Sequence, residues 1–241
     1  EVFNAVTMIP CPIVGLYFIL AGKWLFDSDI LQAKENLKEF TPSVNFFEDG
    51  QCIYSSRLPH IYALPPLPTL AIVTGVVLHT PCSMLYHCMC AYKLPAGIER
   101  LNHWSRRLDQ SMIHLMSLLN SYGDSGNVDY TLFVLMFVLD SIYHLQQPGH
   151  RPLKRMIVAF LMPILPLIAN GYYVEAMQLM LIYGVSGWLF AAYPFGGWSH
   201  GIFHLVCLFS IPVTLSVSTK LEASQEALHI AARCAALFNA R

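Results

Sequence analysis

Charged side chains are scarce in this sequence of 241 residues. Asp, Glu, Lys and Arg together account for 12% of it, while 55% of the residues are hydrophobic. A soluble domain usually carries about 25% charged residues. This shortage excludes an ordinary soluble domain and predicts an integral, multi-pass membrane protein whose immediate partners are membrane lipids.

Two further shortages narrow the possible functions. The formal net charge is -1, and the sequence has no basic patch with interleaved aromatic side chains, so we expect no nucleic-acid partner. The cysteines form no Cys-x-x-Cys pair and fall mostly in apolar segments. A thiol in such a segment behaves as a small apolar group, and a framework of disulfides is therefore not expected.

Apolar segments that are long enough to cross a bilayer recur along the chain. We predict an all-α fold, a seven-transmembrane helix bundle, with residues 1–218 as a single membrane domain. An odd number of spans places the two termini on opposite sides of the membrane. The predicted spans are residues 5–26, 67–91, 108–123, 128–145, 153–170, 174–193 and 198–218.

Two segments stand apart from the predicted spans. Residues 27–66 are the least apolar part of the chain and are predicted to form a long non-cytoplasmic loop, which is either a lid or an interaction surface. Residues 219–241 are rich in alanine and place apolar residues on one helical face, which predicts an amphipathic tail at the membrane or on a partner. Both segments are candidate contacts for partner subunits.

The distribution of basic residues predicts the orientation. The short loops after the third and fifth spans contain acidic residues only, whereas those after the second and fourth are basic. By the positive-inside rule, the basic loops and the N-terminus face the cytoplasmic-type side, and the C-terminus lies opposite. The basic residues are Lys93, Arg100, Arg106, Arg107, Arg151, Lys154 and Arg155.

Histidines are predicted to gather at the basic end of the bundle. His200 and His204 lie one helical turn apart, so both imidazoles can reach a single ion. His87, near the end of the second span, and Asp109, in the first turn of the third, fall at the same depth. Three neutral imidazoles with one open position form the ligand set of a catalytic zinc. The alternative is a set of buried histidines that are satisfied by hydroxyl and carbonyl groups.

Two further residues are candidates for catalysis. Zinc lowers the pKa of its bound water to about 7, and Asp109 is placed to orient that water or to act as a general base. Ser83, one turn before His87, could hydrogen-bond the water or a substrate carbonyl. We expect His79 to be a core histidine bonded to Ser, Thr or Asn, and residues 123–127 to form a turn.

Several short motifs carry a resemblance to a known family. Residues 83–87 read S-x3-H, residues 106–111 read R-x-L-D-x-S, residues 200–205 read H-x-x-F-H-L, and residues 1–7 read E-x-x-N-x-x-T. In this set and order the chain resembles the progestin and adipoQ receptor / hemolysin III family, within the seven-span alkaline ceramidase-like membrane hydrolases. The family often has histidine at the position of Met8, and the loop of residues 27–66 is longer than expected.

The resemblance implies a function. It implies that His87, His200 and His204 are zinc ligands, that Ser83 and Asp109 position the water, and that an amide such as that of ceramide is hydrolysed. We therefore expect a zinc-dependent intramembrane hydrolase of a lipid amide or ester, with a zinc-bound water as nucleophile. The alternative is a non-catalytic receptor-like protein, or an accessory subunit of a membrane complex, that retains a structural zinc. A fourth protein ligand would favour this alternative, and an open position would favour the enzyme.

Overall fold

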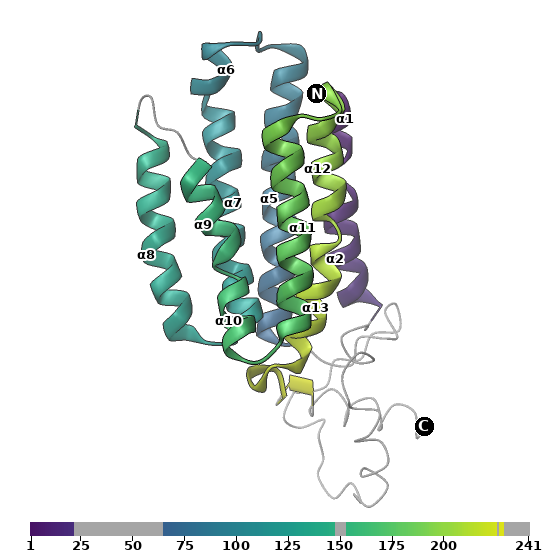
Figure 1. Ribbon diagram of the computed structural model, residues 1–241, viewed down its shortest axis with the longest axis vertical. Coiled ribbons are helices and arrows are strands. Elements are labelled where there is room, and N and C mark those ends of the chain that lie inside the picture. The colour runs from purple at the N-terminus through teal and green to yellow at the C-terminus, as the bar shows by residue number, and fades with distance from the viewer. Residues whose placement is uncertain (22–64, 148–152, 226, 229–241) are drawn as a thin grey trace, which may run out of the picture.

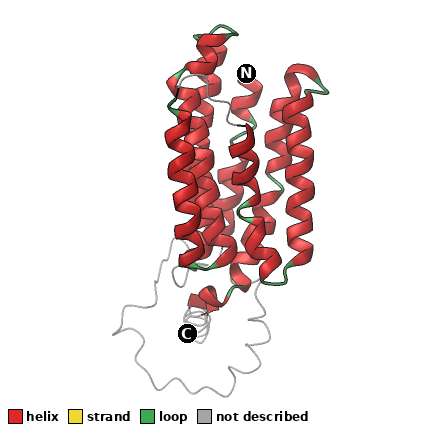
Figure 2. Cartoon of the chain, turned by 60° about the vertical axis from the view of Figure 1, so that its left-hand side comes forward, coloured by secondary structure: helices red, strands yellow, loops and turns green. Residues whose placement is uncertain are grey.

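The computed structural model describes residues 1–21, 65–147, 153–225 and 227–228. The predicted loop of residues 27–66 lies outside the described residues except for Pro65 and Pro66, as does the predicted tail beyond residue 228. Within the described part every regular element is a helix, which confirms the all-α class. The longest helices run side by side and form an elongated bundle (Figures 1 and 2).

The helices follow one another along the chain with short connections. The first half of the described chain contains α1 (Val2–Val6), α2 (Pro10–Leu20), α5 (Leu67–Tyr92), α6 (Ile98–Asn102), α7 (Trp104–Ser125) and α8 (Val128–Leu145). The second half contains α9 (Leu153–Leu161), α10 (Ile164–Ala169), α11 (Tyr173–Ala192), the 3-10 helix η2 (Gly196–Trp198), α12 (Ser199–Cys207) and α13 (Ser210–Lys220).

Five helical stretches are long and apolar enough to cross a membrane. They are Val2–Leu20, Leu67–Tyr92, Val128–Leu145, Tyr173–Ala192 and Gly196–Lys220. Of the other two predicted spans, residues 108–123 lie within α7, and residues 153–170 are divided at Met162 and Pro163 into the shorter α9 and α10. Proline cannot donate the backbone hydrogen bond that a continuous helix needs, and this accounts for the break.

The polar composition of α7 has a structural reason, because its polar side chains face the interior of the bundle. Helix α7 packs against α5, α8, α9, α10 and α13. A hydropathy average counts these inward polar groups against the helix, although lipid would not meet them. The buried polar residues of α7 are Ser105, Asp109, His114, Ser117, Asn120, Ser121 and Asp124.

The connection between α7 and α8 is shorter than the turn predicted at residues 123–127. Helix α7 continues through Ser125 and ends at Gly126, whose φ of 63° lies in the left-handed region that favours glycine. Asn127 then caps α8, since its side-chain oxygen accepts a hydrogen bond of 2.9 Å from the backbone of Tyr130. The prediction was therefore wrong for residues 123–125, and Asp124 is a buried helical residue.

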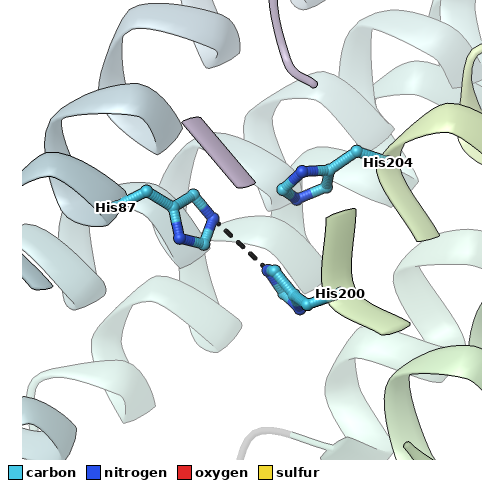
Figure 3. Close-up of side chains that lie close together, drawn as sticks. All are labelled: His87, His200 and His204. Atoms are coloured by element: carbon cyan, nitrogen blue, oxygen red, sulfur yellow. Dashed lines mark hydrogen bonds between the residues drawn. The ribbon is translucent and has the colours of Figure 1, made fainter. Parts of the chain in front are cut away.

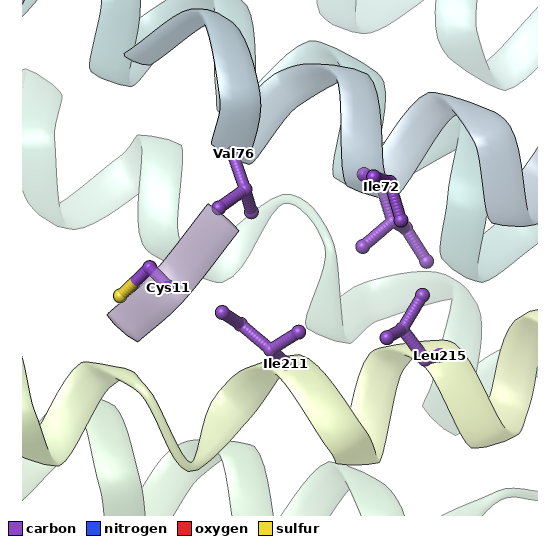
Figure 4. Packing of buried hydrophobic residues seen from close by; sticks show 6 residues of the cluster. Cys11, Ile72, Val76, Ile211 and Leu215 are labelled. Atoms are coloured by element: carbon purple, nitrogen blue, oxygen red, sulfur yellow. The ribbon is translucent and has the colours of Figure 1, made fainter. Parts of the chain in front are cut away.

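An apolar cluster joins the helices that carry the histidines. Side chains from α2, α5 and α13 meet in the bundle interior (Figure 4). This contact holds α12, which continues into α13, alongside α5, and so brings together residues that are more than a hundred positions apart in the sequence. The cluster consists of Cys11, Ile72, Val73, Val76, Ile211 and Leu215.

Candidate metal centre

Three histidines meet at the end of the bundle where α1 and α6 lie. His87 comes from the last turns of α5, while His200 and His204 come from α12, and one ring nitrogen of each lies within 4.8 Å of the other two. Figure 3 shows the three rings directed toward one another. His87 is 2% exposed and His204 is 6% exposed. The three histidines therefore lie close enough, and deep enough, to hold a metal ion together.

Hydrogen bonds from the N-terminal segment fix the tautomers of two of these rings. His87 Nδ1 lies 2.9 Å from Glu1 Oε2, and His204 Nδ1 lies 3.1 Å from both the Asn4 backbone oxygen and Thr7 Oγ1. A carboxylate and a carbonyl oxygen only accept hydrogen bonds, so each Nδ1 must donate. The lone pair of each ring is then on Nε2. Histidine ligands of metals are commonly oriented by such a bond to a carboxylate or a backbone carbonyl.

The third ring leaves a polar atom without a partner. His200 Nε2 faces His87 Nε2 at 3.3 Å, while the buried Nδ1 of His200 has no hydrogen-bond partner. Because His87 Nε2 carries no proton in its fixed tautomer, the two facing nitrogen atoms need a shared proton or a cation between them. Neutral imidazoles with converging lone pairs are a donor set that fits a zinc ion.

Close packing of α1 on α12 brings the N-terminal segment to the histidines. A Cβ atom added at Gly201 would lie 2.2 Å from the ring of Phe3 and 3.2 Å from Asn4 Oδ1. Phe3 also packs edge-on against Trp198, with ring centroids 4.8 Å apart. Only glycine allows this approach, which the bonds from Asn4 and Thr7 to His204 require.

We expect Gly201→Ala to destabilise the protein by about 1–3 kcal/mol, because the added methyl group overpacks the α1–α12 contact. Thermal unfolding of the purified protein measures this effect. Gly187→Ala is the matched control, because a Cβ at this helical glycine of α11 would have no neighbour within 4 Å. Equal stability of Gly201→Ala and the wild type would show that α1 does not need this close approach.

Glu1 joins the histidines to the loop that follows α5. Its Oε1 accepts a hydrogen bond of 2.8 Å from Arg100 Nη1, and Arg100 Nη2 donates to the backbone oxygens of Cys90 and Leu94 at 3.0 and 2.9 Å. The hydrogen bond from His87 lowers the pKa of Glu1 from 4.5 to about 2, although partial burial acts in the opposite direction. Glu1 is therefore a carboxylate at neutral pH. The sequence analysis assigned no role to Glu1 or Arg100, although the E-x-x-N-x-x-T pattern was a signal for Glu1.

Asp109 lies beside the histidines but is not part of their group of converging atoms. Its Oδ1 lies 3.3 Å from His79 Nε2, so the prediction that His79 pairs with Ser, Thr or Asn was wrong. Asp109 also interacts electrostatically with His87 and with the buried Ser83. Within the described residues, His, Cys, Asp and Glu side chains contribute three ligand atoms to the group and no fourth.

Comparisons of the chain with models of protein families, with curated proteins and with solved structures found no match in any of the three. The fold and the site therefore define a class by themselves. The protein has an all-helical bundle with helices of membrane-spanning length, and a buried cluster of three histidines that can hold a metal ion.

Proposed function

We propose that the protein is a zinc-dependent intramembrane hydrolase of a lipid amide or ester. The observation that carries the proposal is the cluster of His87, His200 and His204, to which the described chain adds no fourth ligand. A structural zinc site usually has four protein ligands, whereas a catalytic site keeps one position open. The proposal also takes α7 and the pair α9–α10 as membrane spans, which gives seven in total, and agrees with the resemblance to the hemolysin III family.

The roles of the side chains follow from their contacts. Zinc in such a site supplies an activated water near neutral pH. Asp109, oriented by His79 at 3.3 Å, is the base that takes up a proton from this water and later returns it to the leaving group. Ser83, buried one turn before His87, donates a hydrogen bond to the substrate carbonyl. Glu1, Asn4 and Thr7 hold the imidazoles in place.

Basic side chains near the same end bear on the substrate. Arg106 and Arg107 line a small pocket of about 20 Å³ together with Asn102 and Gln110. Positive charge at the mouth of a site favours a headgroup or product that carries negative charge. We propose that water and the polar product use this end of the bundle, while the acyl chain of the substrate lies among the apolar helices.

Asp109→Asn separates catalysis from metal binding. We expect this variant to keep its zinc, because Asp109 is not among the three ligands, and to lose at least about 10²-fold in turnover, as is typical when a general base is removed. Zinc content and the release of labelled acyl chains from lipid amides and esters are measured on the same purified sample. Asp140→Asn is the matched control, because Asp140 lies on α8 and pairs with Arg155.

The outcomes distinguish the enzyme from its alternative. Unchanged turnover in Asp109→Asn would remove Asp109 from the catalytic role. A wild-type protein that holds one zinc per chain but hydrolyses no lipid in the panel would instead support a receptor-like protein or accessory subunit with a structural zinc.

A further inference from the structure

The end of α7 remote from the histidines holds a second buried acidic group. Asp124 is 0% exposed, and neither of its carboxylate oxygens has a hydrogen-bond partner. With a rise of about 1.5 Å per residue, α7 places Asp124 roughly 22 Å from Asp109 along the helix axis. The group therefore lies outside the metal centre and has no part in the proposed hydrolysis.

A second unpartnered oxygen lies one helical turn away. Asn120 is 8% exposed, and its buried Oδ1 has no hydrogen-bond partner. Side chains four residues apart share one face of a helix, with Cβ atoms about 5–6 Å apart. The amide oxygen of Asn120 and the carboxylate of Asp124 can therefore reach one point between them. Tyr183 of α11 is an electrostatic neighbour of Asp124.

The described part of the chain provides no positive charge for Asp124. Asp124 takes part in none of the ion pairs among the described residues, and Lys220 is paired with Glu175 at 3.0 Å. An ionised carboxylate without a partner is strongly unfavourable in an apolar interior. Asp124 must therefore bind either a proton or a cation from outside the protein.

An acidic pocket opens beside this end of α7. It has a volume of about 740 Å³, and its lining begins at Ser125, the residue that follows Asp124. The pocket lining includes Asp129 and Glu222. Two carboxylates at one opening raise the local concentration of cations. The unpartnered oxygens of Asn120 and Asp124 thus lie close behind a surface that attracts positive ions.

We propose that Asn120 and Asp124 bind a small monovalent cation, for which Na⁺ is the probe. Oxygen ligands favour hard cations, and the single charge of Asp124 balances a single positive charge. Ca²⁺ takes about six to eight oxygen ligands, with several carboxylates among them. The described residues bring only one buried carboxylate to this point, which favours a monovalent ion.

Thermal unfolding of the full chain in NaCl and in choline chloride at equal ionic strength tests the proposal. An ion that binds the folded state raises Tm with its concentration. We expect the Tm of the wild type to be higher in NaCl, and the difference to saturate and to disappear in Asp124→Asn. Asn120→Ala, which removes one ligand, should raise the half-saturating Na⁺ concentration about tenfold. Asp140→Asn, at the other end of the bundle, should respond as the wild type does.

Two results would overturn the proposal. One is an equal Tm for the wild type in the two salts, which would mean that Asp124 holds a proton. The other is a difference that persists in Asp124→Asn. If Asp124→Asn does not fold, Asn120→Ala decides the question, and an unchanged half-saturating Na⁺ concentration in that variant would contradict the assigned site.

Discussion

Replacing any one of His87, His200 and His204 by alanine is expected to remove stoichiometric zinc from the purified protein. Three ligands leave none to spare, and two imidazoles hold zinc too weakly to retain it through purification. The ring nitrogens of the three residues lie within 4.8 Å of one another, so none of them is closer to the metal position by a margin that would make the others dispensable. We expect the three variants to behave alike.

Metal analysis of each variant after gel filtration measures this effect. His144→Ala is the matched control, because His144 lies on α8, pairs with Asp140 at 3.5 Å and is 40% exposed. It should keep the zinc content of the wild type. Full zinc retention in all three variants of the cluster would contradict the metal centre, whereas loss in only one or two would show that the ion is held elsewhere on the α5–α12 contact.

Glu1→Ala is expected to weaken zinc binding by about 10–100-fold, the usual effect of removing a group that orients a metal ligand. Glu1 is the only described acceptor for His87 Nδ1, at 2.9 Å. Without it the His87 ring loses both its fixed tautomer and its orientation. Glu1→Gln should have a smaller effect, because the amide oxygen still accepts the hydrogen bond while the charge paired with Arg100 is lost.

Competition with a chelator of known affinity measures the zinc affinity of these variants. Glu99→Ala is the matched control, because Glu99 is an exposed acidic residue of α6 at the same end of the bundle. A destabilised fold alone would lower Tm in Glu1→Ala and Glu1→Gln to a similar degree without ordering their affinities. Wild-type affinity in Glu1→Ala would mean that His87 is held without its carboxylate partner.

Local patterns in the sequence were sufficient to predict the fold class and the histidine cluster. The long apolar runs, such as residues 128–145, predict membrane-length helices because backbone groups in lipid must be satisfied within a segment. The spacing of His200 and His204 places both rings on one helical face. Adding His87 required only that its span run toward the same side of the membrane as the start of the last one.

Other contacts could not be predicted because they depend on how distant segments pack. The bond between His87 and Glu1 joins residues 86 positions apart, and the pair of His79 and Asp109 joins two different helices. Hydropathy averages also miss direction, so a helix such as α7, with its polar groups inside, reads as too polar for a span. Asp124 follows Gly123 in a sequence typical of a turn, and only the tertiary packing keeps it helical and buried.

X-ray absorption at the zinc edge of the purified full chain tests the central claim most directly. The account predicts one zinc per chain, with three imidazole nitrogen ligands at about 2.0–2.1 Å and one oxygen ligand in the remaining position. A sulfur ligand, a complete set of four protein ligands, or a protein that contains no zinc when purified in its presence would contradict it.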